Sequence, residues 1–404
     1  MRTARPAGAP TPAGRESRPR IVVVSYLAHS PYSPRGIRTR AVVEALQRKC
    51  SVELIAGPEE RSDSVQPRVG RSLARKAVNF AHSSVLLDRF EPWSWRRFHT
   101  WHPGGAGAIL IGFPFSPPAY AARRLELAGI PYVVDVGDPW VLTKSGGRAA
   151  TRGLALFRAQ RSERRLWAAA AGAVVTTQGQ RLALERLFPQ LPILVRPNGY
   201  WPQDRSEPLG PAPTAERGPT LRLAHFGDIY VARLDLVPFL ERLVHSGKWE
   251  RVELHQYGSD WTGTLVAESS ATIVFHKPLP WAEVIQTATA YDLAMVVGNR
   301  DPTQLPSKAV AYLQLPIPRL AVVEDEGGDA LADYVAGRAG WAVVAANGSD
   351  VAAIVQRHVS RQWTSEELAE PGEERWDRVS AEIVDFCLRC VLPPGTGEPR
   401  TALI

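Results

Sequence analysis

The chain has 404 residues, of which 45% are hydrophobic and 22% charged, as is usual for a folded protein of two ordinary domains. No apolar run approaches the roughly 18 residues that a membrane span needs, and residues 1–20 lack the apolar centre of a secretory signal. We therefore expect a cytoplasmic protein. The net charge of +7 is compatible with nucleic acid, an anionic membrane surface or a phosphorylated substrate. Because the chain has no dense Lys/Arg run and no nucleic-acid motif, we expect no nucleic acid as a partner, whereas a peripheral membrane contact stays open.

Strand-like runs rich in Val and Ile alternate with helical stretches along the first half of the chain. The expected strands are 20–26, 51–57, 107–113, 131–137, 172–178 and 192–199, and the expected helices are 39–49, 118–129, 150–170 and 179–188. The strands are apolar throughout, which is typical of parallel strands covered on both faces. This alternation predicts a doubly wound α/β domain.

A second series of the same kind follows a proline-rich stretch. Its expected strands are 221–227, 251–258, 272–278, 292–298, 319–323 and 341–346, with helices at 235–246 and 281–289. We therefore predict an α/β fold of two Rossmann-like doubly wound domains that face a central cleft, where ligands bind at the carboxyl ends of the strands. The predicted parts are a disordered basic arm (1–19), an N-terminal domain (20–201), a linker (202–219), a C-terminal domain (220–361), a helical segment (362–391) and a flexible tail (392–404).

Several motifs with well-known chemistry are absent. The sequence has no P-loop, no G-x-G-x-x-G after the first strand, no D-x-D and no G-x-S-x-G. These absences argue against P-loop ATPases, nicotinamide dehydrogenases, metal-dependent single-domain sugar transferases and serine hydrolases. Cys387 and Cys390 form a lone C-x-x-C without further ligands, so we expect no metal site.

Polar residues follow two predicted strands of the N-terminal domain. His29, Gly36 and Arg38 lie in the stretch after the first strand, and Asp138 and Trp140 directly follow the strand 131–137. A glycine admits close approach of a ligand, and an arginine binds phosphate or carboxylate. Asp138 is a candidate base or orienting group for a reacting hydroxyl. The structural alternative for Gly36 and Arg38 is an ordinary glycine turn with solvated arginines. The structural alternative for Asp138 is a helix cap or a turn.

The C-terminal domain repeats a glycine followed by a cation. Gly227 ends the strand 221–227, and Arg233 follows it. Further on, in LPSKAVAYLQLPIP, we expect Ser307 to cap a helix over 309–315, which places Lys308 in its first turn. A helix N-terminus repels a cation, so a lysine there suggests an anion between the two. Arg233 and Lys308 would then form an anion clamp, the alternative being a solvent-facing lysine.

Taken in order along the chain, these segments resemble the two-domain GT-B glycosyltransferases of the nucleotide-sugar-dependent family 4. The resemblance rests on SYLAHSPYSPRGIRTRAVVEAL, VVDVGDPW, AGAVVTTQGQRLALER, RPNGY, LAHFGDIY and LPSKAVAYLQLPIP, and it covers nearly the whole chain. It implies transfer of a sugar from a nucleotide diphosphate sugar, as co-substrate, to an acceptor hydroxyl. It further implies retention of anomeric configuration, no metal ion and no other cofactor. The N-terminal domain would hold the acceptor and the C-terminal domain the donor nucleotide.

The resemblance also assigns roles to residues. Asp138 would be catalytic, and His29, Arg38 and Trp140 would face the acceptor. The donor diphosphate would be bound by a second set, namely Gly36, Gly227, Arg233, Ser307 and Lys308.

Two positions depart from the family pattern. Gly137 stands where the family often has a histidine, and Ala311 stands where a glutamate usually binds the donor ribose. A non-catalytic partner of a glycosyltransferase is therefore a second hypothesis, and a nucleotide-sugar epimerase is a third, disfavoured by the few acids in the cleft loops. The Trp-rich segment 58–104 is either an acceptor platform or an ordinary packed loop. The acceptor is a natural product or a saccharide.

Overall fold

The computed structural model describes residues 18–30, 33–57, 101–112, 115–142, 154–202, 219–229, 233–263, 265, 268–369 and 372–393. The predictions for the basic arm, for most of the linker, for most of the Trp-rich segment and for the tail fall outside the described residues.

The N-terminal half forms a six-stranded sheet in the order β2-β1-β3-β4-β5-β6, and every paired strand is parallel. Its strands are β1 (Arg20–Ser25), β2 (Ser51–Ala56), β3 (Gly107–Ile111), β4 (Tyr132–Val136), β5 (Gly172–Val175) and β6 (Ile193–Val195). The helices that follow these strands include α1 (Pro34–Gln47), α4 (Ser116–Leu127), α5 (Leu154–Ala168) and α6 (Gln178–Leu187).

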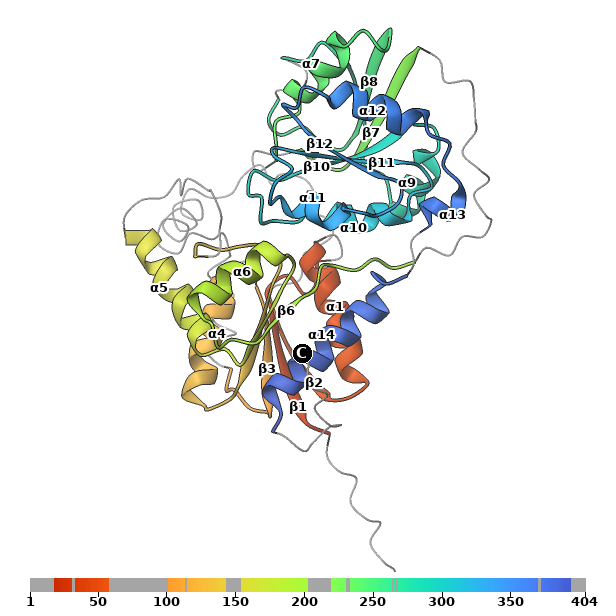
Figure 1. Ribbon diagram of the computed structural model, residues 1–404. Coiled ribbons are helices and arrows are strands. Elements are labelled where there is room, and N and C mark those ends of the chain that lie inside the picture. The colour runs from red at the N-terminus through yellow and green to blue at the C-terminus, as the bar shows by residue number, and fades with distance from the viewer. Residues whose placement is uncertain are drawn as a thin grey trace, which may run out of the picture.

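The C-terminal half repeats the plan with the order β12-β11-β10-β7-β8-β9, again parallel. The strands are β7 (Thr220–Phe226), β8 (Arg251–Tyr257), β9 (Thr272–His276), β10 (Leu293–Val297), β11 (Arg319–Val323) and β12 (Trp341–Ala345). The helices are α7 (Val237–His245), α9 (Trp281–Ala288), α10 (Ser307–Ala311), α11 (Ala330–Val335), α12 (Val351–Ser360) and α13 (Ser365–Leu368). The predicted pair of Rossmann-like domains is thus confirmed (Figure 1).

Helices cover both faces of each sheet, which explains the uninterrupted apolar runs. The central strands β3, β4 and β10 are buried along their whole length. The last helix, α14 (Trp376–Val391), belongs to the N-terminal lobe, where it packs beside α1 and fills one face of the first sheet (Figure 1). Among the described helices, none has the length and apolar character to span a bilayer.

Helix α1 begins five residues earlier than the sequence pattern predicts, since its N-cap is Ser33, which accepts a hydrogen bond from the backbone N–H of Arg35. Arg38 therefore lies inside the helix and is fully buried. Its Nε donates to both carboxylate oxygens of Asp135 at 3.0 and 2.8 Å, and its terminal nitrogens bind the carbonyls of Arg196 and Pro197. The prediction that Arg38 faces an acceptor is wrong, because the fold itself occupies its guanidinium.

This buried pair predicts a large stability effect. Replacing Arg38 by Met leaves the Asp135 carboxylate without its partner in the core, which costs about 3–5 kcal/mol in proteins. We expect Arg38→Met to lower the free energy of unfolding in urea by that amount. Arg40→Met, on the exposed face of the same helix, is the matched control and should change it by less than about 0.5 kcal/mol. Equal effects of the two substitutions would contradict the assignment.

Candidate functional site

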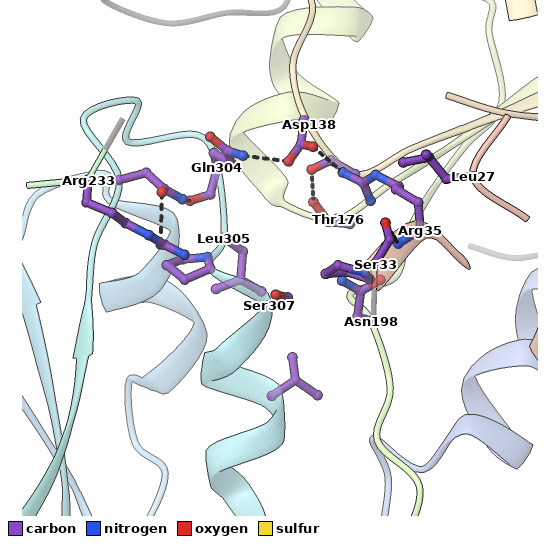
Figure 2. Close-up of a pocket in the computed structure, with 15 residues that line it drawn as sticks. Leu27, Ser33, Arg35, Asp138, Thr176, Asn198, Arg233, Gln304, Leu305 and Ser307 are labelled. Atoms are coloured by element: carbon purple, nitrogen blue, oxygen red, sulfur yellow. Dashed lines mark hydrogen bonds and ion pairs between the residues drawn. The ribbon is translucent and has the colours of Figure 1, made fainter. Parts of the chain in front are cut away.

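A cavity of about 200 Å³ lies between the two lobes, at the carboxyl ends of both sheets. One wall is made by residues that follow strands of the N-terminal domain, and the other by the loop after β10 and the start of α10 (Figure 2). We call it the interdomain cavity. Its polar lining consists of Ser33, Arg35, Asp138, Thr176, Asn198, Arg233, Asn299, Gln304 and Ser307. Parallel strands thus converge on one site, as the fold class predicts.

Asp138 makes one of the contacts between the lobes. One carboxylate oxygen pairs with Nη2 of Arg35 at 2.5 Å, and the other accepts a hydrogen bond from Nε2 of Gln304 at 2.5 Å (Figure 2). A second contact between lobes lies nearby, where the Thr177 hydroxyl donates to the carbonyl of Thr303 at 2.7 Å. The two domains are therefore tied together at this edge of the cavity.

Arg35 is a site residue that the sequence reasoning missed. It is 6% exposed, and its Nε is buried without a hydrogen bond to any described residue. Its guanidinium lies against Gly137, where a Cβ atom would collide with it. Gly137 therefore leaves the space that Arg35 fills. Nothing in the run SPRGIRTR distinguishes Arg35 from Arg38.

On the opposite wall, Arg233 is held by its own domain. Its Nη1 donates to the carbonyl of Val297 at 3.1 Å and to Oδ1 of Asn299 at 2.9 Å. The side chain is buried while lining the interdomain cavity. Arg233 thus places a guanidinium group on this wall of the interdomain cavity.

Lys308 lies close to Arg233, at the edge of a second cavity of about 340 Å³. Its ammonium packs directly on Gly227, whose φ of +141° is a backbone conformation that favours glycine. The ammonium makes no hydrogen bond or ion pair with any described residue. Burial, together with the charge of Arg233, lowers the pKa of Lys308 to about 8, although Asp228 partly opposes this. The buried Arg233 and the half-buried Lys308 thus lie close together.

Buried polar groups behind Gly227 fix its position. Nε2 of Gln256 donates to the carbonyl of Gly227 at 2.5 Å, and Oε1 of Gln256 lies 2.8 Å from Nδ1 of His225. Since the amide oxygen accepts, Nδ1 of His225 carries the proton. Burial, together with the charge of Lys308, lowers the pKa of His225 to about 3, so the ring is neutral at neutral pH. The network therefore positions the backbone without adding a third charge.

The second cavity, which we call the aromatic cavity, continues from the first. Pro34, Asn198 and Ser307 line both. The rest of its lining is mostly aromatic and aliphatic, and includes Tyr200, Trp201, Phe226, Tyr257, Pro278, Leu279, Trp281, Ala311 and Trp376. The two cations therefore lie between a polar cavity and an apolar one.

The predictions for Gly36 and Ser307 need correction. Gly36 lies within α1, and a Cβ there would collide with the carbonyls of Ser30 and Leu27, so this glycine lets the helix pack on the chain's own loop. It lines neither cavity. Ser307 lines both cavities, but the N-cap of α10 is Pro306, which has no side-chain hydrogen bond, and the helix is five residues long.

Two acceptor-side predictions are wrong as well. His29 is exposed in the loop after β1 and lines neither cavity. Trp140 is buried in the N-terminal domain, where its ring stacks on Phe115 with centroids 4.8 Å apart. It lines a separate cavity between α4 and α5. Of the predicted set, the structure brings together Asp138, Arg233, Ser307, Lys308 and Gly227. No group of three or more potential metal-ligating side chains occurs within the described ranges.

No protein-family profile and no curated protein sequence matches the chain. Solved structures do match its fold. The Anabaena protein HepE in complex with UDP-glucose is similar over 93% of this chain and 96% of its own, at a TM-score of 0.54 and 11% identity. An MnaA–UDP co-structure from S. aureus is similar over 90% of this chain and 94% of its own, at a TM-score of 0.52 and 10% identity. Sucrose-phosphate synthase from Thermosynechococcus elongatus is similar over 91% of this chain and 98% of its own, at a TM-score of 0.58 and 12% identity. These similarities establish the fold, which is the GT-B architecture.

The lowered pKa of the half-buried Lys308 predicts an unusual pH dependence of stability. Because the folded-state pKa of Lys308 is lowered from 10.5 to about 8, its burial is unfavourable below pH 8, and the penalty fades as pH rises toward 10.5. We expect Lys308→Met to be more stable than the parent at pH 7, by about 1–3 kcal/mol, with the gain shrinking above pH 8. Urea unfolding at several pH values measures this.

The exposed Lys277 offers a matched control. Lys277→Met should leave the free energy of unfolding unchanged within about 0.5 kcal/mol over the same pH range. A destabilised Lys308→Met at pH 7 would show that the ammonium has a stabilising partner, against the present assignment.

Proposed function

We propose that the chain is a glycosyltransferase that takes a nucleotide diphosphate sugar as donor. The observation that carries this proposal is a pair of neighbouring cations, the buried Arg233 and the half-buried Lys308, between a polar interdomain cavity and an aromatic one. A diphosphate carries two adjacent negative groups, and such a pair of cations neutralises it. The GT-B architecture supports the same donor class, as does the UDP-glucose bound to HepE, which shares the fold.

In this proposal, each part of the donor occupies a different part of the two cavities. The diphosphate lies at Arg233 and Lys308, beside the Ser307 hydroxyl and the backbone of Gly227. The nucleoside enters the aromatic cavity, where a flat base stacks on rings. The sugar points into the interdomain cavity, toward Asp138. Negative charge builds on the diphosphate as the glycosidic bond breaks, so the two cations stabilise the transition state more than the ground state.

Asp138 faces the sugar and acceptor in this arrangement. Arg35 and Gln304 hold both of its oxygens, and a fixed carboxylate orients a hydroxyl by accepting its hydrogen bond. We propose this role for Asp138, with the acceptor a saccharide or natural product approaching from the N-terminal domain. The same proposal includes retention of the anomeric configuration, as in family 4. It also includes neutralisation of the diphosphate by Arg233 and Lys308 in place of a metal ion.

A non-catalytic partner protein is the second candidate, favoured by one observation. Asp138 is the only carboxylate that lines either cavity among the described residues. A transferase that binds its donor through carboxylates would have more carboxylates lining these cavities. The same scarcity argues against an epimerase, which needs several acidic groups around its sugar.

Calorimetry with a panel of nucleoside diphosphates at low salt tests the proposal. We expect one nucleotide to bind at micromolar Kd, and Lys308→Ala to weaken it tenfold or more, equivalent to about 1.4 kcal/mol. Lys277→Ala, an exposed lysine outside both cavities, is the control and should leave Kd unchanged.

Two results would contradict the proposal. Absence of binding by every nucleotide would reject the donor site and favour the partner protein. Unchanged binding by Lys308→Ala would reject the clamp. Slow hydrolysis of the matching nucleotide sugar by the purified protein, followed by NMR, would distinguish a transferase from a protein that only binds nucleotides.

A further inference from the structure

The aromatic cavity has an unusual lining for a site that would hold a sugar ring. Its walls are aromatic and aliphatic side chains, and its polar side chains are Asn198, Ser307, Lys308 and Gln314, apart from the tyrosines. No carboxylate lines it among the described residues. Carboxylates are the strongest acceptors for a pair of neighbouring hydroxyls, because each offers two charged oxygens.

The polar groups present are largely committed elsewhere. The Gln314 amide bridges the carbonyl of Trp201 and the indole N–H of Trp281, at 3.1 and 3.2 Å. Oδ1 of Asn198 accepts from the buried Arg38 at 3.4 Å. Ser307 lies where the two cavities join, and Lys308 packs on Gly227. Gln314 and Asn198 thus have partners within the protein, Lys308 can only donate, and Ser307 offers a single hydroxyl, so none of the four offers the paired acceptor oxygens of a carboxylate.

Ala311 forms part of the wall of the aromatic cavity beside Lys308. It lies three residues after Lys308 on α10. An alanine offers only a methyl group to the ligand. The wall nearest to the cation that would bind the diphosphate is thus apolar.

We propose that this site recognises the diphosphate and the base but not the ribose hydroxyls, so that 2′-deoxyribonucleoside diphosphates bind as well as ribonucleoside diphosphates. This inference rests on the proposed function, since it takes the aromatic cavity as the nucleoside site. The physical reason is an asymmetry in recognition. A site built to hydrogen-bond a hydroxyl rejects the analogue without it by factors of about 10⁴–10⁵, whereas an apolar pocket discriminates weakly against an added hydroxyl. The donor class therefore includes 2′-deoxyribonucleotide sugars.

Calorimetry with pairs that differ only at the 2′ position tests this: ADP and dADP, GDP and dGDP, CDP and dCDP, UDP and dUDP. For the base that binds, we expect Kd values within threefold of each other. A preference of tenfold or more for the ribonucleotide would overturn the inference.

Ala311→Glu provides the second arm. It adds a carboxylate to the apolar wall, so we expect it to raise the ribose preference to tenfold or more. Ala311→Met adds similar length without an acceptor and should leave the ratio near one. A new carboxylate near Lys308 weakens diphosphate binding for both members of a pair, and the ratio cancels that effect. An unchanged ratio in a folded Ala311→Glu protein would show that the ribose lies elsewhere and would overturn the inference.

The outcomes separate the two proposals. If no member of any pair binds, both the donor site and this inference are rejected. If ribonucleotides bind with strong preference, the donor site stands and only the inference about its specificity fails.

Discussion

The buried ion pair between Arg38 and Asp135 determines where the polar groups of the N-terminal domain lie. It joins α1 to β4, and the same guanidinium binds carbonyls in the segment that follows β6. Helix α1, the residues directly after β4 and the segment after β6 all line the interdomain cavity, and among their wall residues are Arg35, Asp138 and Asn198. A charge removed from water in a sheet interior needs a partner with well-defined geometry. That requirement fixes the relative positions of the three elements, and through them the site.

Two glycines make room for two of the cations that line the cavities. Gly137 leaves room for the guanidinium of Arg35, and Gly227 leaves room for the ammonium of Lys308. In both places a Cβ atom would collide with the charged group. The glycines therefore act by admitting protein cations into space beside the strand ends, and the cations in turn face the cavities. This differs from the expectation that glycine brings the backbone itself close to a ligand.

Sequence reasoning recovered the alternation of strands and helices because buried parallel strands are apolar throughout, and that signal is local. It also placed Asp138, Arg233 and Lys308 at strand ends that meet in space. It could not choose among Arg35, Arg38 and Arg40, three arginines within one helical turn and a half, because burial depends on which face of α1 meets the sheet. One signal was present: Asp135 interrupts an otherwise apolar strand, and a buried carboxylate implies a buried cation.

The choice of Lys308 as a ligand-binding residue rests finally on its energetic cost. A half-buried lysine that has no hydrogen-bond or ion-pair partner among the described residues and lies near an arginine destabilises the chain that carries it. A bound anion would offset this cost, because the free energy lost by burying the ammonium would be recovered as affinity. The aromatic cavity beside it supplies apolar contact area, and the neutral His225 behind it adds no further repulsion. These features support the proposal of a ligand that joins a flat apolar group to a strongly negative one.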